Sequence, residues 1–157
     1  MTRLALLGLT LLLLLPAACA RHSGESAEVS HGRELLVKAG CNDCHTEGFL
    51  AEGGIVPEER WLTGSKLGYR GPWGTQYPSN LRLLLAGIDE DQWLVLAKRM
   101  RTNSPMAWSM LPSLSDADLR DLYFYIRWLG PAGEAAPQAL GPGVEPTTKF
   151  LYFPRSH

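Results

Sequence analysis

The chain has 157 residues, a length that suits one ordinary domain with additional segments. Its 15 lysines and arginines nearly balance its 16 aspartates and glutamates. This balance argues against a nucleic-acid-binding protein, because such proteins are usually held by many contacts between basic side chains and phosphates.

Residues 1–20 have the layout of a secretory signal peptide. Arg3 supplies a positive start, residues 4–15 are mostly leucine, and small residues follow. The apolar run is short for a membrane span. Cleavage is expected after Ala20; alternatively Cys19, in the lipoprotein-box-like "LPAAC", is lipidated and anchors the mature chain. In both cases we expect the rest of the protein to reach the periplasm of a bacterium.

A polar spacer is expected over residues 21–29, followed by the main domain over residues 30–131. The pattern that starts at Ser30 predicts a short helix with this serine as its N-cap. Apolar residues fall near one face of that helix, and Gly40 ends it just before a pair of cysteines.

Residues 46–82 contain many glycines and prolines and show no clean hydrophobic period. A structureless loop of this length is unusual inside a compact domain. It becomes reasonable if its aromatic side chains wrap a large apolar group. These side chains include Phe49, Trp61, Trp73 and Tyr77.

Two further helices have clear N-terminal signals. Asp89 is expected to cap the first, and Gln92 completes a capping-box-like pair. Ser115 is expected to cap the second, in which Asp118 is the third helical residue, and Gly130 ends it. Helices joined by long loops, with no evident strand pattern, predict an all-α fold.

Residues 132–157 form a stretch that is rich in proline and glycine and has no periodicity. We interpret it as an extended C-terminal arm. The residues expected to pin it to the domain are Phe150, Leu151, Tyr152 and Phe153.

The segment "CNDCH" at residues 41–45 contains the candidate functional residues, two cysteines and a histidine. A redox-active dithiol would need a thioredoxin-like βαβ context, and no strand pattern surrounds this segment. A structural zinc site needs four ligands, but the sequence after this segment has no cysteine and a single histidine, His157. A disulfide between Cys41 and Cys44 would close a very small loop and leave His45 unexplained.

Covalent haem attachment explains all three residues. The Cys41 and Cys44 thiols can reach the vinyl groups of one haem, and His45 then supplies an axial ligand to the iron. Attachment of this kind takes place outside the cytoplasm, which agrees with a signal peptide. The haem would also be the apolar group that the long loop wraps. We therefore predict one covalently bound haem c.

The residues alone leave the second axial ligand open. Met100 lies within a predicted helix and suits a core position, and His157 is the last residue of the tail. Met106 and Met110 both lie in the non-helical stretch between two helices, where a loop can place a thioether over the iron. The pattern favours neither strongly.

From residue 32 to residue 129 the chain resembles the small class I c-type cytochromes. The resemblance implies about three to four helices around one haem, with long loops. It also implies that an N-terminal helix crosses the C-terminal one, with Gly32 allowing a close approach to Tyr125.

The same resemblance bears on the methionine ligand. In this family it usually stands in "MP", shortly before the "S-D-x-D" start of the last helix. Met106 stands nine residues before Ser115, at the family's spacing. The resemblance therefore implies Met106 as the ligand, with Met110 as the alternative, although Ala107 stands where proline is expected.

The stretches "GPWGTQYPSNL" and "MAWSMLPSLSDADLRDLYFYI" look closer still to the cytochrome domains that serve membrane-bound alcohol and aldehyde dehydrogenases. The resemblance implies that the Pro72 carbonyl lies near the Nδ1–H of His45, a contact that would orient the ring. It further implies haem-pocket roles for Trp73, Tyr77 and Asn80.

With both axial positions filled, we expect an electron carrier and not an enzyme. Its partners would be transient redox proteins that dock through a small interface, or a membrane-bound dehydrogenase that it serves as a dedicated subunit. No nucleic-acid partner is expected. Lys98, Arg99 and Arg101 form a positive docking patch, or are simply solvated cations favoured by a helix C-terminus.

Two other readings remain. A haem enzyme or gas sensor would have a weak or open sixth position, and Ala107 leaves room for that. An exported binding or structural module would carry the "CNDCH" match by accident and would purify colourless.

Overall fold

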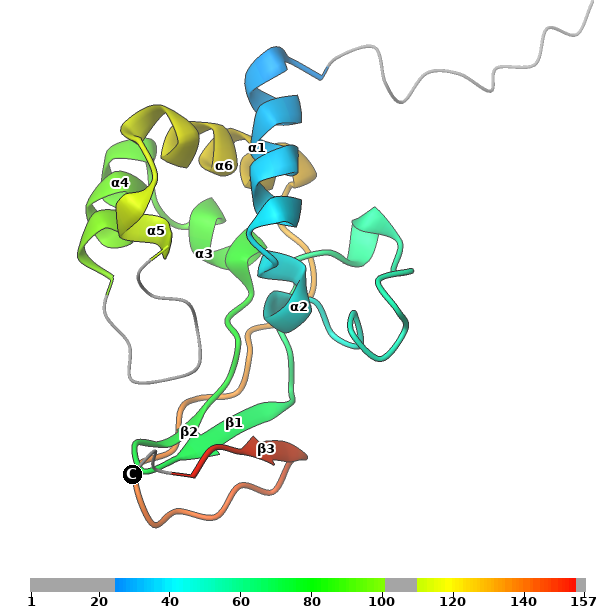
Figure 1. Cartoon of the computed structure of the whole chain (residues 1–157), viewed down its shortest axis with the longest axis vertical. Helices are drawn as coiled ribbons and strands as arrows, with labels where there is room; N and C mark the ends of the chain where they lie inside the picture. Colours follow the sequence, from blue (N-terminus) through cyan, green and yellow to red (C-terminus); the bar gives the residue numbers. More distant parts are fainter. Residues whose placement is uncertain (1–24, 101–109, 155–157) are drawn as a thin grey trace, which may run out of the picture.

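The computed structural model describes residues 25–100 and 110–154 and is mostly helical over them. The helices form the upper part of the molecule in Figure 1, and a small sheet with the C-terminal arm forms the lower part. The helices are α1 (Ala27–Lys38), α2 (Cys41–His45), α3 (Leu81–Ala86), α4 (Glu90–Arg99), α5 (Met110–Ser113) and α6 (Asp116–Leu129), with a 3-10 helix, η1, at Glu58–Arg60. The strands are β1 (Gly68–Gly71), β2 (Gly74–Gln76) and β3 (Phe150–Tyr152). The helical content confirms the predicted all-α class.

The first helix begins earlier than predicted. The N-cap of α1 is Ser26, whose Oγ accepts a hydrogen bond from the Val29 backbone N–H at 3.4 Å. The expectation that Ser30 is the N-cap is therefore wrong, and residues 27–29 of the expected spacer are helical. The earlier start places Val29 in the buried core, which favours the longer helix.

Helices α1 and α6 cross with almost no space between their backbones. A Cβ atom on Gly32 would lie 1.9 Å from the carbonyl oxygen of Asp121 and 3.0 Å from the Cβ of Tyr125. Tyr125 itself is completely buried. The predicted approach of Gly32 to Tyr125 is confirmed, and a residue without a side chain is required at the crossing.

A polar cluster ties this crossing to the segment that follows α2. The Tyr125 hydroxyl donates a hydrogen bond to the Glu58 carboxylate at 2.6 Å, and Arg33 Nε donates to the same oxygen at 2.7 Å. Burial, assisted by the contact with Glu58, raises the pKa of Tyr125, so its hydroxyl remains a donor. Helix η1 is thereby fixed against α1 and α6.

The predicted starts of α4 and α6 are confirmed. Asp89 and Gln92 form a capping box in which each side chain bonds the backbone N–H of the other. Ser115 and Asp118 form the second capping box. Helix α6 ends at the predicted place, where Gly130 adopts a φ of 70° that favours glycine.

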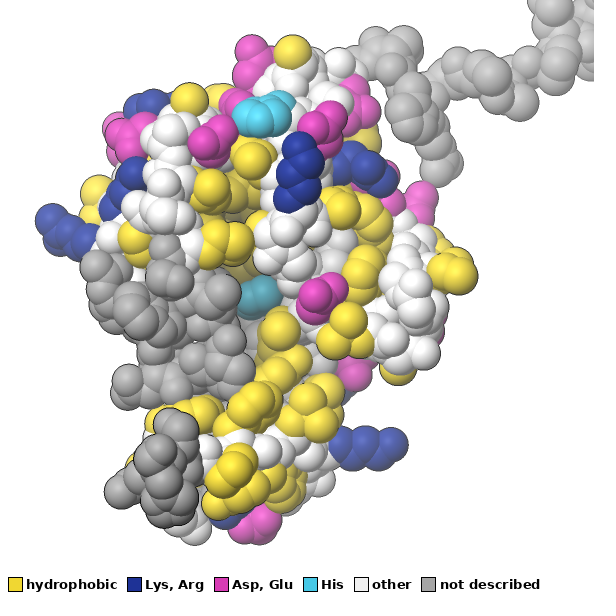
Figure 2. Space-filling model, viewed as in Figure 1, with side chains coloured by type: hydrophobic (Ala, Val, Ile, Leu, Met, Phe, Trp, Pro, Cys, Tyr) yellow, Lys and Arg dark blue, Asp and Glu magenta, His cyan; other side chains and the backbone are white. Residues whose placement is uncertain are grey.

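The sheet was not predicted from the sequence. β1 pairs antiparallel with β2 and parallel with β3, so the strand order is β2-β1-β3. The predicted pinning of the arm is confirmed, because its residues 150–152 form β3. The exposed hydrophobic side chains of the structure include those of β3, and Figure 2 shows hydrophobic side chains gathered over the sheet end. In the described part of the chain, no helix has the length and apolar character needed to cross a membrane.

Replacing Gly32 with alanine is expected to lower the free energy of unfolding by about 3 kcal/mol, because the new Cβ collides with a backbone carbonyl. Gly87→Ala is the matched control. A Cβ there would lie 3.6 Å from the Leu84 carbonyl oxygen, so a change within about 0.5 kcal/mol is expected. Denaturant unfolding of both variants measures the difference, and equal losses would contradict the close crossing.

Candidate functional site

The two cysteines and the histidine of "CNDCH" lie together on α2. Gly40, with a φ of 65°, turns the chain from the end of α1 into this short helix. Cys41 and Cys44 are half-buried, free thiols, and His45 is 8% exposed. The helix therefore brings two thiols and one imidazole to a single short element, as the sequence predicts.

His45 is held at both its ring and its backbone. Its Nδ1 lies 2.8 Å from the Ser79 carbonyl oxygen, and a carbonyl can only accept, so Nδ1 carries the proton and donates. The His45 carbonyl accepts a hydrogen bond from the Gly64 N–H at 2.8 Å. Among residues 25–100 and 110–154, Nε2 has no hydrogen-bond partner. This tautomer leaves the Nε2 lone pair ready to bind a metal.

The carbonyl that orients His45 is not the one expected. The resemblance pointed to Pro72, but Pro72 is exposed in the turn between β1 and β2. Ser79 stands just before Asn80, the N-cap of α3. The chain therefore reaches the His45 ring where it enters α3, several residues after the turn that carries Pro72.

A hydrogen-bond chain fastens the segment after η1 to α2. Thr46 Oγ1 donates to Asn42 Oδ1 at 2.7 Å and accepts from the Leu62 backbone N–H at 2.8 Å. Leu62 is completely buried and has a φ of 61°, a strained conformation for a leucine. Its burial and its bond to Thr46 hold it there, and they keep the neighbouring Gly64 close to His45.

Burial sets the ionisation of the site. It lowers the pKa of His45, and the bond to Ser79 partly offsets that effect, so the imidazole is neutral near neutral pH. Burial raises the pKa of the Cys41 thiol to about 12. A thiol that stays protonated is a poor redox nucleophile. A neutral imidazole is the form that binds metals.

The other protein-only uses of this segment fit less well. The two thiols are not joined in a disulfide. Within the residues that the structure describes, no group of three or more histidine, cysteine, aspartate or glutamate side chains could hold a metal ion. Two thiols and an oriented imidazole are instead the donor set that covalent haem requires.

The residues assigned to the haem pocket have other contacts in the structure. Trp73 Nε1 donates to the Tyr69 carbonyl at 3.4 Å, and the Tyr77 hydroxyl bonds Thr148 Oγ1 of the arm at 2.8 Å. Asn80 Oδ1 caps α3, while its Nδ2 donates to two backbone carbonyls of the arm. The amide of Asn80 is therefore fully used within the protein, which speaks against a bond to a haem propionate.

Two contacts to the site could not be found from the sequence. One is the Ser79 carbonyl, since a backbone atom leaves no residue-type signal. The other is Tyr69, whose hydroxyl donates to Cys44 Sγ at 3.4 Å. Tyr69 lies on β1, and no strand pattern marks β1 in the sequence.

The methionine candidates are only partly placed. Met106 lies outside the described residues. Met110 is half-buried and begins α5, so part of the stretch expected to be non-helical forms a short helix. Met100 is the C-cap of α4 and packs against the core, as expected. The choice between Met106 and Met110 stays a prediction.

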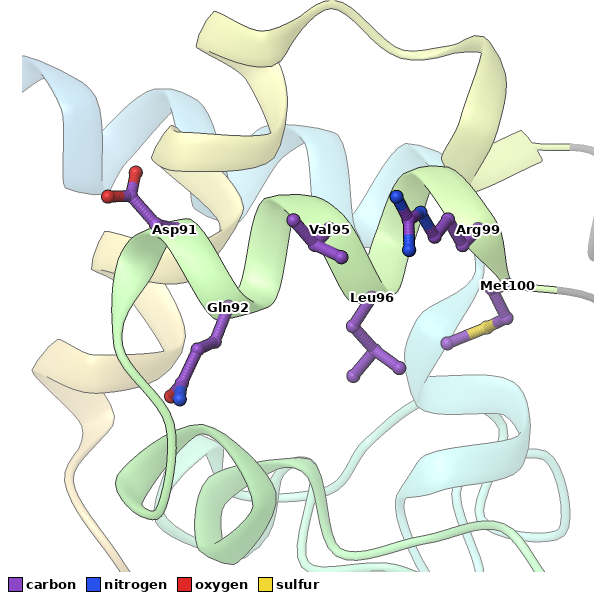
Figure 3. Close-up of a pocket in the computed structure, with 6 residues that line it drawn as sticks. All are labelled: Asp91, Gln92, Val95, Leu96, Arg99 and Met100. Carbon is purple, nitrogen blue, oxygen red and sulfur yellow. The ribbon is translucent and has the colours of Figure 1, made fainter.

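An apolar groove runs along α4, directly before the segment that carries Met106. Figure 3 shows the side chains that line it, with Gln92 and Leu96 pointing to the side of α4 on which α3 lies. The lining residues are Asp91, Gln92, Val95, Leu96, Arg99 and Met100. None belongs to α2, so the groove does not define the site by itself.

Comparisons with known proteins agree with this donor set. A family model described as Cytochrome c matches residues 29–130. The match begins in α1, includes α2 and ends just after α6, so the C-terminal arm lies beyond it. Searches of curated proteins and of solved structures gave no match.

Replacing Gly64 with alanine is expected to loosen the hold on His45. Gly64 has a φ of +84°, and a Cβ there would lie 2.9 Å from the Asn80 nitrogen and 3.1 Å from the Pro78 carbonyl oxygen. The Ser79 carbonyl between them must then shift. We expect the free energy of unfolding to fall by about 3 kcal/mol, and the His45 Nδ1 proton to exchange faster with solvent in nuclear magnetic resonance spectra.

Gly53→Ala is the matched control for that variant. Gly53 also has a positive φ, of +64°, but a Cβ there would meet nothing within 4 Å. Gly53→Ala is expected to lower the free energy of unfolding by only about 1 kcal/mol, which is the cost of a positive φ for alanine. The exchange of the His45 proton is expected to stay unchanged. Identical behaviour of the two variants would show that Gly64 does not position the Ser79 carbonyl.

Proposed function

The chain belongs to the cytochrome c family, a family of haem-based electron-transfer proteins, and from that premise we propose that it carries single electrons between redox partners outside the cytoplasm. Its cofactor is haem c, bound covalently, and Cys41, Cys44 and His45 fit the C-x-x-C-H attachment motif. The observation that carries the proposal is the fixed imidazole of His45, which donates to Ser79 and leaves Nε2 free for iron.

Different residues of the chain have different roles in binding the haem. Cys41 and Cys44 would hold the haem through thioether bonds, and His45 Nε2 would bind its iron. The bound haem supplies a one-electron couple at its iron. The Ser79 carbonyl fixes the ring plane of His45, and the hydrogen bond makes the imidazole a more basic ligand.

A carrier benefits from a ligand that does not move. His45 is anchored through its ring to Ser79 and through its backbone to Gly64. Both anchors belong to chain segments that are packed against the core by Leu62 and Leu85. The imidazole can therefore stay in place when the iron changes oxidation state, which keeps the structural rearrangement of each electron transfer small.

We further propose that Met106 would supply the second protein ligand to the iron. A thioether is a soft ligand that favours the ferrous state and raises the reduction potential. This assignment rests on the spacing of Met106 from Ser115, and Met110 is its alternative. With both ligands in place, the iron would have no open site for a substrate or gas, which favours a carrier over an enzyme.

The location and partners follow from sequence features. Residues 1–20 would direct the chain to the periplasm, where Cys19 either is removed with the signal or anchors the protein through a lipid. The partners would be transient redox proteins or a membrane-bound dehydrogenase. Of the cations expected to form a positive patch, Lys98 pairs with Asp116 at 3.0 Å and donates to the Leu114 carbonyl, and Arg101 lies outside the described residues, so the patch stays a prediction.

The optical spectrum of the ferric protein tests the axial assignment. Wild type and Met110→Ala are expected to show the weak long-wavelength band of a methionine–iron bond, and Met106→Ala is expected to lose it. Met106→Ala should also bind carbon monoxide readily when reduced, whereas wild type should resist it. Met100→Ala is a control for general disturbance of the region.

Two outcomes would change the proposal in different ways. Loss of the band in Met110→Ala alone would move the ligand to Met110 and leave electron carriage intact. A wild-type spectrum of high-spin haem, with ready binding of carbon monoxide, would favour the haem enzyme or gas sensor and contradict the carrier.

A further inference from the structure

The C-terminal arm extends beyond the part of the chain that matches the family, and it is closely built into the sheet. Leu140 exchanges two backbone hydrogen bonds with Thr75 of β2, at 2.9 and 2.8 Å. After crossing to the other side, the arm pairs with β1 as β3, in register Tyr69 with Leu151. Figure 1 shows the arm passing below the sheet and returning along β1. The arm thus engages both outer edges of the β1–β2 hairpin.

The end of the arm reaches the residue that touches Cys44. The Phe153 ring stacks on the Tyr69 ring, with centroids 5.8 Å apart and planes inclined by 26°. The Phe153 backbone N–H donates to the Arg70 carbonyl at 2.7 Å, which fixes Phe153 beside β1. Tyr69 in turn donates its hydroxyl to Cys44 Sγ at 3.4 Å. A direct line of contacts therefore joins the arm to the haem-attachment motif.

A second aromatic ring closes the cluster. The Trp73 ring lies 6.5 Å from that of Phe153, and its Nε1 donates to the Tyr69 carbonyl at 3.4 Å. Arg70 adds an ion pair with Glu145 of the arm at 2.7 Å. Tyr69 is thus held from its ring face and from its backbone by groups that the arm helps to place.

We infer that the arm is a functional part of the haem site: Phe153 positions Tyr69, whose hydroxyl donates a hydrogen bond to the Cys44 sulfur and raises the reduction potential of the haem. A thioether sulfur keeps lone pairs that accept a weak hydrogen bond. The positive end of the Tyr69 O–H dipole then points towards the sulfur that would hold the haem, and it disfavours ferric iron, with one more positive charge, more than ferrous iron. Hydrogen bonding and burial near a haem are established means of setting its potential.

Tyr69 contacts the Cys44 sulfur directly, whereas Phe153 is a positioning residue that acts through Tyr69. The inference needs the haem to be attached through Cys44, and it does not depend on the proposed role as a carrier. An equilibrium redox titration of the haem-loaded protein reads out the potential whether or not the protein exchanges electrons with a partner. Failure of the inference and failure of the proposed function are therefore distinguishable.

The test compares hydroxyl-removing variants of the full-length protein loaded with haem. Tyr69→Phe keeps the ring and removes the hydroxyl, and its midpoint potential is expected to shift below that of wild type. Tyr123→Phe is the matched control, because Tyr123 donates its hydroxyl to the Ile88 carbonyl at 3.2 Å and not to the haem motif. Its potential is expected to equal that of wild type.

A second pair of variants tests the arm. Phe153→Ala is expected to shift the potential in the same direction as Tyr69→Phe, and the double variant should shift it by less than the sum. Tyr152→Ala, at the neighbouring residue that ends β3 and is 66% exposed, should leave it unchanged. Phe153→Leu replaces Phe153→Ala if the latter fails to retain covalent haem. An unchanged potential in Tyr69→Phe, or additive shifts in the double variant, would overturn the inference.

Discussion

The two-point anchoring of His45 is the constraint on which the rest of the site depends. One anchor is the Ser79 carbonyl on the ring, and the other is the Gly64 N–H on the backbone carbonyl, each at 2.8 Å. Both come from segments distant from α2 in sequence, so the fold must bring them back to the "CNDCH" helix. A free ring would sample several orientations, whereas this one presents Nε2 in a single direction.

The remaining architecture serves that anchoring from two sides. On the helical side, the tight crossing at Gly32 and the Tyr125–Glu58 hydrogen bond set the position of the chain that returns through Leu62 and Gly64. On the other side, the β1–β2 hairpin leads the chain to Ser79, and the arm pairs with β1, which carries Tyr69 and its hydrogen bond to Cys44. The arm is therefore continuous with the site although the family match ends before it.

The parts of the structure that could be predicted from the sequence are those encoded by neighbouring residues. The spacing of Cys41, Cys44 and His45 and the capping boxes at Asp89 and Ser115 are local patterns with a direct physical meaning. Contacts between backbones are not encoded in this way. The Ser79 carbonyl has no residue signature, and β1 is too short and too rich in glycine to show alternation, so Tyr69 remained hidden. The prediction that Ser30 is the N-cap failed because a serine four residues earlier, Ser26, suits an N-cap equally well, and the helix that starts there buries Val29.

The most direct test of the carrier role is the rate of electron self-exchange between ferric and ferrous protein, measured by nuclear magnetic resonance of their mixtures. An imidazole that stays anchored in both oxidation states predicts fast exchange and a haem that is low-spin in both. Slow exchange, accompanied by a change of spin state or of axial ligand on reduction, would show that the site rearranges, and it would contradict electron carriage.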